Sequence, residues 1–352
     1  MNKLFDQPLH SWMRGGGPQG DIILSSRIRL ARNLEGVPFH NRNSGKDLAE
    51  VVEKVRQVLL TLTAAGEEYE LIEMDQLSQL EQSVLVEKHL ISPNLVNNAL
   101  HRAVLVGADG SVSIMINEED HLRIQCLEPG LDLKSALIKA NKVDDLLEES
   151  LTFAFSEQLG YLTACPTNVG TGMRASCMLH LPALVLTKQF NRIIAAATQL
   201  GLAVRGFYGE GTEAIGNVFQ ISNQLTLGFT EEEIVDSLNS VVQQIVDQER
   251  AARNFLMTQS KLAITDRLWR SYGILRYAHS MSGQEALSRL SEVRLGIDLG
   301  IITGLDPLIY NELLVTTRPN YMTKQAGTKD MDSETRDEVR AEVIRTKITE
   351  NE

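Results

Sequence analysis

"RAVLVGADGSVSIMINEEDHLRIQCL" (residues 102–127) contains the clearest strand pattern of the chain. Its apolar residues alternate on both sides of the Asp-Gly pair at 109–110, which predicts a β-hairpin with a tight turn. The run 121–127 predicts a third strand, so the acidic triplet 118–120 lies at a corner between two strands. Adjacent carboxylates repel each other, and this indicates that a cation binds among them.

The rest of the chain mixes helical and strand patterns. Apolar spacing predicts helices at 46–63 and 142–160, and strands at 176–181, 202–207 and 217–227, with a helix that ends at Gly201 between the first two. Thr230 and Glu233 form a capping box before a long helix. "RGGGPQGD" (14–21) indicates a mobile lead-in, and short helical patterns dominate from about residue 255. The expected fold class is α+β: a mostly antiparallel sheet flanked by helices, followed by a smaller helical C-terminal domain.

The composition is that of a globular protein: of 352 residues, 43% are hydrophobic and 23% charged. The net charge of −12 argues against a general nucleic-acid binder and suits a protein that takes cationic substrates. The N-terminus lacks the apolar segment of a signal peptide, and no apolar run is long enough to span a bilayer. Cys126, Cys165 and Cys177 have no metal-ligand spacing, and their odd number fits a reducing compartment. We therefore expect a cytoplasmic protein with no membrane contact.

Arginine recurs beside small residues in four separate stretches: "SSRIRLAR" (25–32), "DHLR" (120–123), "TGMRAS" (171–176) and "VRGFYGEGTE" (204–213). Arg27 and Arg29 alternate, so on a strand they point the same way. A guanidinium forks onto phosphate oxygens in a way that lysine cannot match. One such stretch is typical of a solvated surface, but four favour a binding site for a polyanion such as a nucleoside triphosphate. No P-loop, kinase Gly-rich loop or dinucleotide fingerprint is present.

Cys165 begins the stretch "CPTNVGTGMRAS" (165–176), whose two glycines allow close backbone approach. An isolated cysteine is most often a small buried hydrophobic residue. Beside an arginine-rich site, however, the pKa of its thiol is expected to fall, which favours a reactive thiolate.

Four segments, "SSRIRLARNL", "NEEDHLR", "CPTNVGTGMRAS" and "RGFYGEGTE", resemble in this order the phosphagen kinases, which include creatine and arginine kinases. The resemblance implies a phosphagen-kinase catalytic domain at 20–254, after a flexible lead-in at 1–19 and before a helical domain at 255–352. The helical domain that precedes this region in the small-molecule enzymes is missing, and Gly211 stands where they usually carry histidine. In both respects the chain is similar to the bacterial protein arginine kinases.

The resemblance also implies the site residues. The residues that match the family's ATP contacts are Ser25, Ser26, Arg27, Ile28, Arg29, Arg123, Arg174, Ala175, Ser176, Cys177, Met178, Arg205, Gly206, Phe207, Tyr208, Gly209 and Glu210, with His89 of "KHLISP" near the nucleotide. Glu119 and Glu210 match the carboxylates that hold and deprotonate the guanidinium, Glu118 and Asp120 flank the first of them, and Cys165 matches the reactive cysteine. The cofactors implied are ATP and Mg²⁺, with no metal site of the protein's own.

A guanidinium needs such an environment because it is a very poor nucleophile while protonated. Removing its proton near neutral pH must overcome about five to six pKa units, on the order of 7–8 kcal/mol. Carboxylates at a strand corner bind the cation, fix its plane and take the proton as it attacks. Arginines and Mg²⁺ on the opposite wall neutralise the transferring phosphoryl group. Taken alone, "NEED" also suits a metal-binding or merely solvated corner.

The function expected is that of an ATP:protein-arginine phosphotransferase. The alternatives are a kinase of a free guanidino compound and a catalytically silent adaptor, against which the intact Glu119, Glu210 and arginines argue. The resemblance further implies a stress-response role: phosphoarginine marks proteins for a Clp protease, a heat-shock repressor is a target, and a zinc-binding protein is the activator. It also implies a homodimer or higher homo-oligomer, while the net charge argues against a direct nucleic-acid partner.

The tail carries one more motif, "RDEVRA" (336–341). Arg336 and Arg340 lie four apart on one helical face, and Asp337 lies three before Arg340. Spacing alone favours a solvated helix with an ordinary ion pair. The motif, which ends at Ala341, also matches the phosphoarginine pocket of the protein arginine kinases, and this implies an allosteric site for the reaction product.

Overall fold

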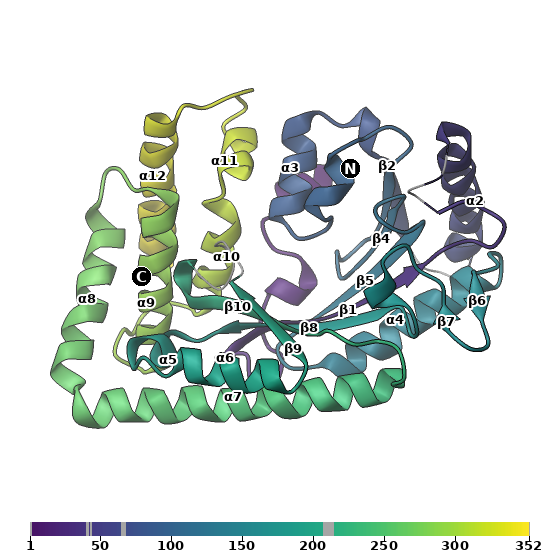
Figure 1. Cartoon of the computed structure of the whole chain (residues 1–352). Helices are drawn as coiled ribbons and strands as arrows, with labels where there is room; N and C mark the ends of the chain where they lie inside the picture. The colour runs from purple at the N-terminus through teal and green to yellow at the C-terminus, as the bar shows by residue number, and fades with distance from the viewer. Residues whose placement is uncertain (1, 40–41, 43, 65–67, 207–214, 352) are drawn as a thin grey trace.

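The computed structural model describes residues 2–39, 42, 44–64, 68–206 and 215–351 (Figure 1). Among these residues, eight strands form one antiparallel sheet in the order β2-β3-β4-β5-β1-β8-β10-β9. The strands are β1 (Ile23–Arg32), β2 (Tyr69–Glu73), β3 (Ala103–Gly107), β4 (Val112–Ile116), β5 (Leu122–Pro129), β8 (Met173–His180), β9 (Leu202–Gly206) and β10 (Val218–Asn223), and β6 (Phe155–Ser156) and β7 (Gly160–Tyr161) pair separately. The expected hairpin and third strand are β3, β4 and β5.

Helices flank the sheet and make up the C-terminal part of the chain, which confirms the expected α+β class. The helices before residue 260 are α1 (Asn2–Asp6), α2 (Gly45–Ala64), α3 (Gln79–Glu87), α4 (Leu133–Glu148), α5 (Pro182–Leu186), α6 (Phe190–Gln199) and α7 (Glu231–Gln259). Those that follow are α8 (Lys261–Tyr277), α9 (Gly283–Asp298), α10 (Leu308–Thr316), α11 (Pro319–Gln325) and α12 (Ser333–Asn351). No helix of the described segments is both long and apolar enough to cross a membrane.

The central strand β1 separates a buried apolar face from a polar face. Ile28 and Leu30 are fully buried on the side that α4 and α7 cover. Arg27 and Arg29 alternate with them and therefore lie on the opposite face, as the sequence predicts. In Figure 1, α7 runs along the covered side of the sheet, which leaves the arginine face turned away from it.

One helix lies about ten residues earlier than predicted. The expected helix at 142–160 is α4, Leu133–Glu148. Asp132 starts it, because its side chain accepts a hydrogen bond from the backbone N–H of Ser135 and so caps the first turn. The residues after 148 instead lead into the β6–β7 hairpin. The capping box at Thr230 and Glu233 is present at the start of α7 as predicted.

The beginning of the chain packs closely and does not form a free lead-in. Leu4, Phe5, Leu9, Trp12 and Met13 are buried in an apolar cluster with residues of α3 and β3. Burying large side chains of this kind stabilises each by about 1.5–3 kcal/mol. The expectation of a flexible segment at 1–19 therefore does not hold for residues 4–13, because their apolar side chains have a core to enter.

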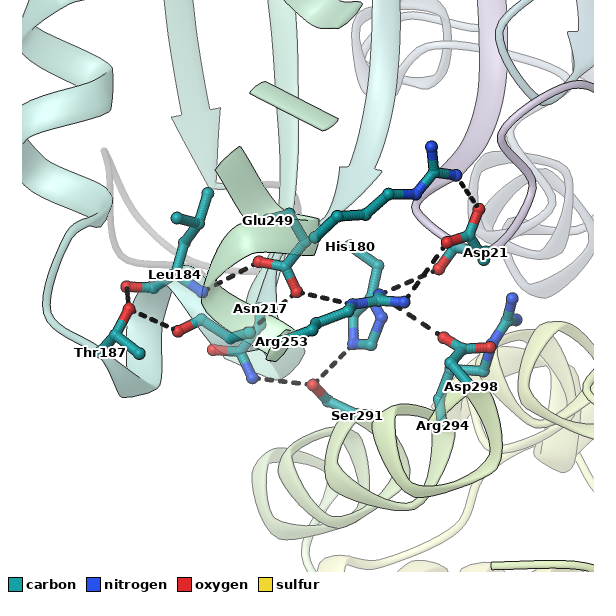
Figure 2. A network of polar contacts seen from close by, with 12 residues as sticks. Asp21, His180, Leu184, Thr187, Asn217, Glu249, Arg253, Ser291, Arg294 and Asp298 are labelled. Atoms are coloured by element: carbon teal, nitrogen blue, oxygen red, sulfur yellow. Dashed lines mark hydrogen bonds and ion pairs between the residues drawn. The ribbon is translucent and has the colours of Figure 1, made fainter. Parts of the chain in front are cut away.

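Polar contacts join the C-terminal helices to the sheet region (Figure 2). Arg253 of α7 donates to Glu249 at 3.0 Å and to the backbone carbonyl of Asp21 at 3.1 Å, and pairs with Asp298 of α9 at 3.6 Å. Glu249 also accepts from the backbone N–H groups of Ala183 and Leu184 at 3.0 and 2.9 Å, at the start of α5. The helix α7 continues past residue 254, the expected end of the catalytic domain, to Gln259. It thus connects the sheet with the helices that follow.

Candidate active site

A pocket of about 110 Å³ collects residues from four separated segments on the arginine face of the sheet. It is lined by Arg29, Ala31, Glu119, Arg123, Cys165, Thr167, Asn168, Gly172 and Arg174. β1, β5 and β8 contribute the arginines, the β4–β5 corner contributes Glu119, and the loop before β8 contributes the cysteine. The fold therefore brings together acidic, arginine and cysteine motifs that lie up to 145 residues apart in the chain, from Arg29 to Arg174.

The arginines of this face are half-buried and lie next to one another. Arg29 and Arg174 are directly opposite in the β1–β8 register. Burial lowers the pKa of Arg27 to about 10, and the charge of Arg123 acts in the same direction. Burial lowers the pKa of Arg29 well below its ordinary value, and three neighbouring arginines lower it further. Cations placed in this way are destabilised until an anion approaches them.

Arg29 and Arg27 differ in their partners. Arg27 donates to Gln220 at 2.6 Å and to Ser176 at 3.3 Å. The buried Nε of Arg29 has no hydrogen-bond partner within the described part of the chain. A buried donor without a partner costs about 1–3 kcal/mol. A phosphate oxygen is an acceptor of the right charge for it, so the cluster fits the triphosphate of a nucleotide.

Arg205 extends the cluster toward the edge of the sheet. It lies opposite Gln220 in the β9–β10 register and is exposed. Burial lowers the pKa of Arg174, and the charges of Arg205 and Arg123 lower it further. Gly206 ends β9, and the next four predicted residues, Phe207, Tyr208, Gly209 and Glu210, lie outside the described residues.

The three carboxylates of the acidic corner have different partners. Glu118 is buried, pairs with Arg123 at 2.7 Å and accepts from the backbone N–H of Glu119 at 2.9 Å and from the hydroxyl of Ser92. These contacts lower its pKa although burial opposes them. Its carboxylate is thus occupied in holding Arg123 in place.

Asp120 ties the corner to the cysteine loop. Its carboxylate accepts from the side-chain amide of Asn33 at 2.7 Å and from the backbone N–H of Ala164 at 2.6 Å. Asn33 in turn accepts from the backbone N–H of His121 at 2.9 Å. Asn33 directly follows the first arginine stretch, and no local sequence pattern indicates this role for it.

Glu119 is the member of the triplet that lines the pocket. Burial raises the pKa of its carboxyl, and the neighbouring charges of Asp120 and Glu118 raise it further, while Arg123 and Arg174 oppose them. A carboxylate with a raised pKa is a stronger base, and a cation close by is its most favourable partner.

Cys165 is half-buried at the same pocket, with its sulfur 3.1 Å from the hydroxyl of Thr167. The other two cysteines are buried, and burial raises the pKa of both Cys126 and Cys177 to about 12. Of the three thiols, Cys165 is the one that a reagent in solution reaches.

Several predicted residues lie away from the pocket. Ser26, Ile28, Ala175 and Cys177 have their side chains on the opposite, covered face of the sheet. Ser26 donates there to the carbonyl of Gly130 at 2.8 Å, and its oxygen lies 3.7 Å from the sulfur of Cys177. The strand alternation that aligns the arginines also turns these four side chains away from them.

His89 lies beside a second, smaller pocket that shares Arg27 with the cluster. This pocket is lined by Trp12, Ser25, Arg27, His89, Leu127, Ser176, Met178 and Gln220. Burial lowers the pKa of His89 to about 3, and the charges of Arg318 and Arg27 add to the effect. Trp12 and Gln220 were not predicted here, because the first segment was expected to be flexible. The large apolar side chains of residues 4–13 are the signal that would have indicated its burial.

The tail motif is far along the chain, in α12. Arg340 is buried and donates to the backbone carbonyls of Thr317 at 3.1 Å and Met281 at 2.8 Å, and it pairs with Asp337. Arg336 donates to the carbonyl of Asp332 at 3.3 Å, and Ala341 is buried. The expected i,i+3 ion pair between Asp337 and Arg340 is present. Its arginine is buried, so the helix is packed against the protein and is not fully solvated.

Comparisons with known proteins relate the chain to an enzyme family. Residues 50–252 match the family "ATP:guanido phosphotransferase, C-terminal catalytic domain", and residues 261–352 match "Protein-arginine kinase McsB C-terminal domain". The chain is 51% identical over 347 residues to a protein-arginine kinase of Brevibacillus brevis, covering 98% of this chain and 97% of that one. It is 50% identical over 348 residues to that of Halalkalibacterium halodurans, covering 99% and 98%.

A solved structure shows the same fold. The duplicated taurocyamine kinase of Schistosoma mansoni, with bound transition-state analogue components, aligns with a TM-score of 0.61 at 25% identity, over 72% of this chain and 37% of that one. Together with the matches over nearly the whole chain, this means that the chain belongs to the protein-arginine kinases of the ATP:guanido phosphotransferase, or phosphagen kinase, family.

Proposed function

We propose that Glu119 receives the guanidinium of an arginine side chain in a protein, while Arg29, Arg123 and Arg174 hold the triphosphate of ATP. The observation that carries the proposal is that these four residues line one pocket, with the carboxylate and the arginines on its walls. The orphaned, buried Nε of Arg29 supports the anion half of the proposal within the described residues. The raised pKa of Glu119 supports the guanidinium half.

In this proposal Glu119 binds the acceptor cation, orients its plane and accepts the proton that leaves as nitrogen attacks phosphorus. Glu118 acts through Arg123, because their 2.7 Å ion pair holds one arginine where the phosphoryl group passes. Asp120 and Asn33 fix the corner against the cysteine loop. The chain thereby supplies position and charge, which dominate catalysis of phosphoryl transfer.

Enzymes of this family use Mg²⁺ with ATP. The described residues contain no cluster of three or more side chains that would hold a metal ion. In the proposal the ion is therefore held chiefly by the phosphates of ATP, where it adds to the positive charge of the arginines.

For the cell we propose that the enzyme acts in the cytoplasm under stress, that its phosphoarginine marks proteins for a Clp protease, and that a heat-shock repressor is one substrate. A zinc-binding activator and a homo-oligomeric assembly complete this proposal. The likeness of nearly the whole chain to protein-arginine kinases supports it. The net charge of −12 also supports it, because this charge favours arginine-bearing, basic substrates.

The test is to incubate the protein with Mg-ATP and either a basic protein or free arginine, and to measure acid-labile phosphate by ³¹P NMR. We expect phosphoarginine on the protein and little on free arginine. Glu119→Gln should abolish transfer and leave ATP binding within about twofold, while Glu149→Gln, a matched change on the exposed end of α4, should behave as the parent. Preferential phosphorylation of free arginine would indicate the small-molecule alternative, and no transfer to either would indicate the silent adaptor.

A further inference from the structure

Large apolar side chains are exposed on two segments beside the active site. Phe155 and Leu159 lie on the β6–β7 hairpin, and Leu225, Leu227 and Phe229 on the loop between β10 and α7. Each is 46–61% exposed. We call these five residues the apolar rim. Single exposed apolar residues are ordinary on a protein surface, but a group of this kind marks an interaction site.

Both segments pack against the loop that carries Cys165. On one side, the backbone N–H of Tyr161 donates to the carbonyl of Gly170 at 2.8 Å, and a Cβ on Gly160 would lie 2.4 Å from that oxygen. On the other side, a Cβ on Gly170 would lie 2.6 Å from the carbonyl oxygen of Thr226. Gly170 has φ +115°, a conformation that favours glycine. Only glycine at this position therefore lets the hairpin, the cysteine loop and the β10–α7 loop pack so closely together.

Side-chain hydrogen bonds fix the same arrangement. The hydroxyl of Thr226, between the exposed Leu225 and Leu227, lies 3.0 Å from the carbonyl oxygen of Thr167 and 2.7 Å from that of Val169, either of which accepts its proton. Thr167 itself lines the active-site pocket. The rim therefore adjoins the cysteine loop, and this loop separates it from the pocket.

The hairpin side of the rim is held firmly. Phe155 packs edge-on against Tyr161 with ring centroids 5.2 Å apart. The guanidinium of Arg32 lies 3.5 Å from the centroid of the Tyr161 ring and is fixed by Asp144 through a buried ion pair of 2.6 Å. A surface anchored in this way loses little conformational entropy when a partner binds.

Acidic residues belong to the elements next to this side of the rim. Asp144 pairs with Arg32, which stacks on Tyr161. Burial raises the pKa of Tyr161; the charge of Arg32 opposes this, while those of Asp144, Glu148 and Glu231 add to it. Glu148 is exposed, and Glu231 accepts from Asn141 at 3.2 Å. The surface next to the pocket thus combines apolar contacts with negative charge, and it is complementary to a polypeptide that carries both arginine and apolar side chains.

We propose that the apolar rim is the docking surface for the substrate polypeptide next to its acceptor arginine, and that it selects arginines with an apolar residue nearby in the chain. The proposal rests on the protein-arginine kinase activity and adds a sequence preference to it. One loop separates the rim from the pocket, so the two are about two backbone spacings, roughly 10 Å, apart. An extended chain covers that distance in about three residues.

The experiment compares two disordered peptides, each with one arginine. One has leucine or phenylalanine three residues to either side of the arginine, and the other has serine there. We expect the parent to use the apolar peptide with a KM about tenfold lower, the effect of burying one or two such side chains. The double change Phe155→Ser with Leu227→Ser should raise that KM to the value for the serine peptide and leave kcat, the KM for ATP and the serine-peptide kinetics unchanged.

The matched control is Ile138→Ser, which removes another exposed apolar side chain, 71% exposed on α4, and should change nothing. The proposal is overturned if the parent does not distinguish the two peptides, or if the double variant slows both equally. It is also overturned if the double variant changes the oligomeric state in solution but not the peptide kinetics. The rim would then be an interface between copies of this chain. Loss of transfer to every peptide by the parent would instead contradict the kinase function itself.

Discussion

Glu118 and Glu119 are consecutive, yet the first is paired with Arg123 at 2.7 Å and the second lines the pocket beside the same arginine. The two neighbouring carboxylates therefore have different roles at the corner. Glu118 neutralises and orients one arginine of the anion site, and Glu119 remains available to a cation. Because the two carboxylates repel each other, the contact between Glu118 and Arg123 also limits how far the pKa of Glu119 rises.

The first prediction concerns the pH dependence of transfer. After burial, the charge of Asp120 is the largest cause of the raised pKa of Glu119. Glu119 must be ionised to act, so the rate falls as pH decreases through its pKa. Removing the charge in Asp120→Asn should lower that pKa and move the acidic limb of the kcat/KM profile to lower pH. An acidic limb that does not move in Asp120→Asn would show that another group controls it; Asp145→Asn, an exposed change on α4, is the control.

The second prediction separates stability from binding at Arg29. Desolvation and the charges of neighbouring arginines destabilise its guanidinium and lower its pKa. Arg29→Met should therefore increase the free energy of unfolding of the ligand-free protein by about 1–2 kcal/mol, a rise in Tm of a few degrees. The same variant should lose the increase in Tm that Mg-ATP gives the parent. A ligand-free Tm below that of the parent would contradict the account of Arg29 as a strained anion site.

Sequence patterns predicted the parts of this molecule that depend on local periodicity. The alternation of Arg27 and Arg29 placed both on one face, and the Asp-Gly turn, the Thr230 cap and the long helix after it were found where expected. The helix at Leu133–Glu148 was misplaced because its start is set by one capping residue, Asp132, and not by the apolar pattern alone.

What the sequence did not reveal depends on contacts between distant segments. Three adjacent acids look alike in a sequence, and only Ser92, Arg123, Asn33 and Ala164 distinguish the roles of Glu118 and Asp120 from that of Glu119. The family resemblance predicted every residue of a matching segment as an ATP contact. In the structure, strand alternation turns the side chains of Ser26 and Cys177 to the face of the sheet opposite the arginines. Tertiary packing, which no local pattern encodes, decides these cases.

The third prediction concerns oxidation. Cys165 is half-buried at the pocket, and burial raises the pKa of Cys126 and Cys177 to about 12, which suppresses their thiolates. Peroxide or a thiol reagent should therefore inactivate the parent by modifying Cys165 and crowding the acceptor site. Cys165→Ser should keep part of the activity and resist peroxide, while Cys126→Ser stays sensitive. Equal sensitivity of Cys165→Ser and the parent would place the reactive group elsewhere.

The fourth prediction concerns acid stability. Burial lowers the pKa of His10 to about 4 and of His89 to about 3. Below pH 6.5 the unfolded chain protonates these rings and the folded protein does not, so stability is lost as pH falls from about 6.5 toward these values. At pH 5 His89 alone should cost the folded state about 2 kcal/mol relative to pH 7.5. Urea unfolding of the parent and His89→Asn at both pH values measures this, since asparagine also tolerates the backbone φ of +59° at that position.

The last prediction concerns regulation through α12. Asp337 is paired with Arg340, whose other donors hold the carbonyls of Thr317 and Met281. Arg336 is on the same helical face and does not take part in that network. We expect free phosphoarginine to bind here, with its phosphoryl group on Arg336 and its guanidinium on Asp337, and to change the kinase rate from a site separate from Glu119.

Two kinds of variant distinguish this regulatory site from a purely structural ion pair. Arg336→Ala and Asp337→Ala should weaken phosphoarginine binding at least about tenfold, the loss of one charge-assisted contact, and leave the ligand-free rate within about twofold. Arg340→Ala should in addition lower Tm, because it leaves two buried carbonyls without their donor. Calorimetric titration and initial rates on the same preparations measure both effects. If Arg336→Ala and the parent bind phosphoarginine equally, the motif is a packing element of α12, with Arg340 as its buried anchor.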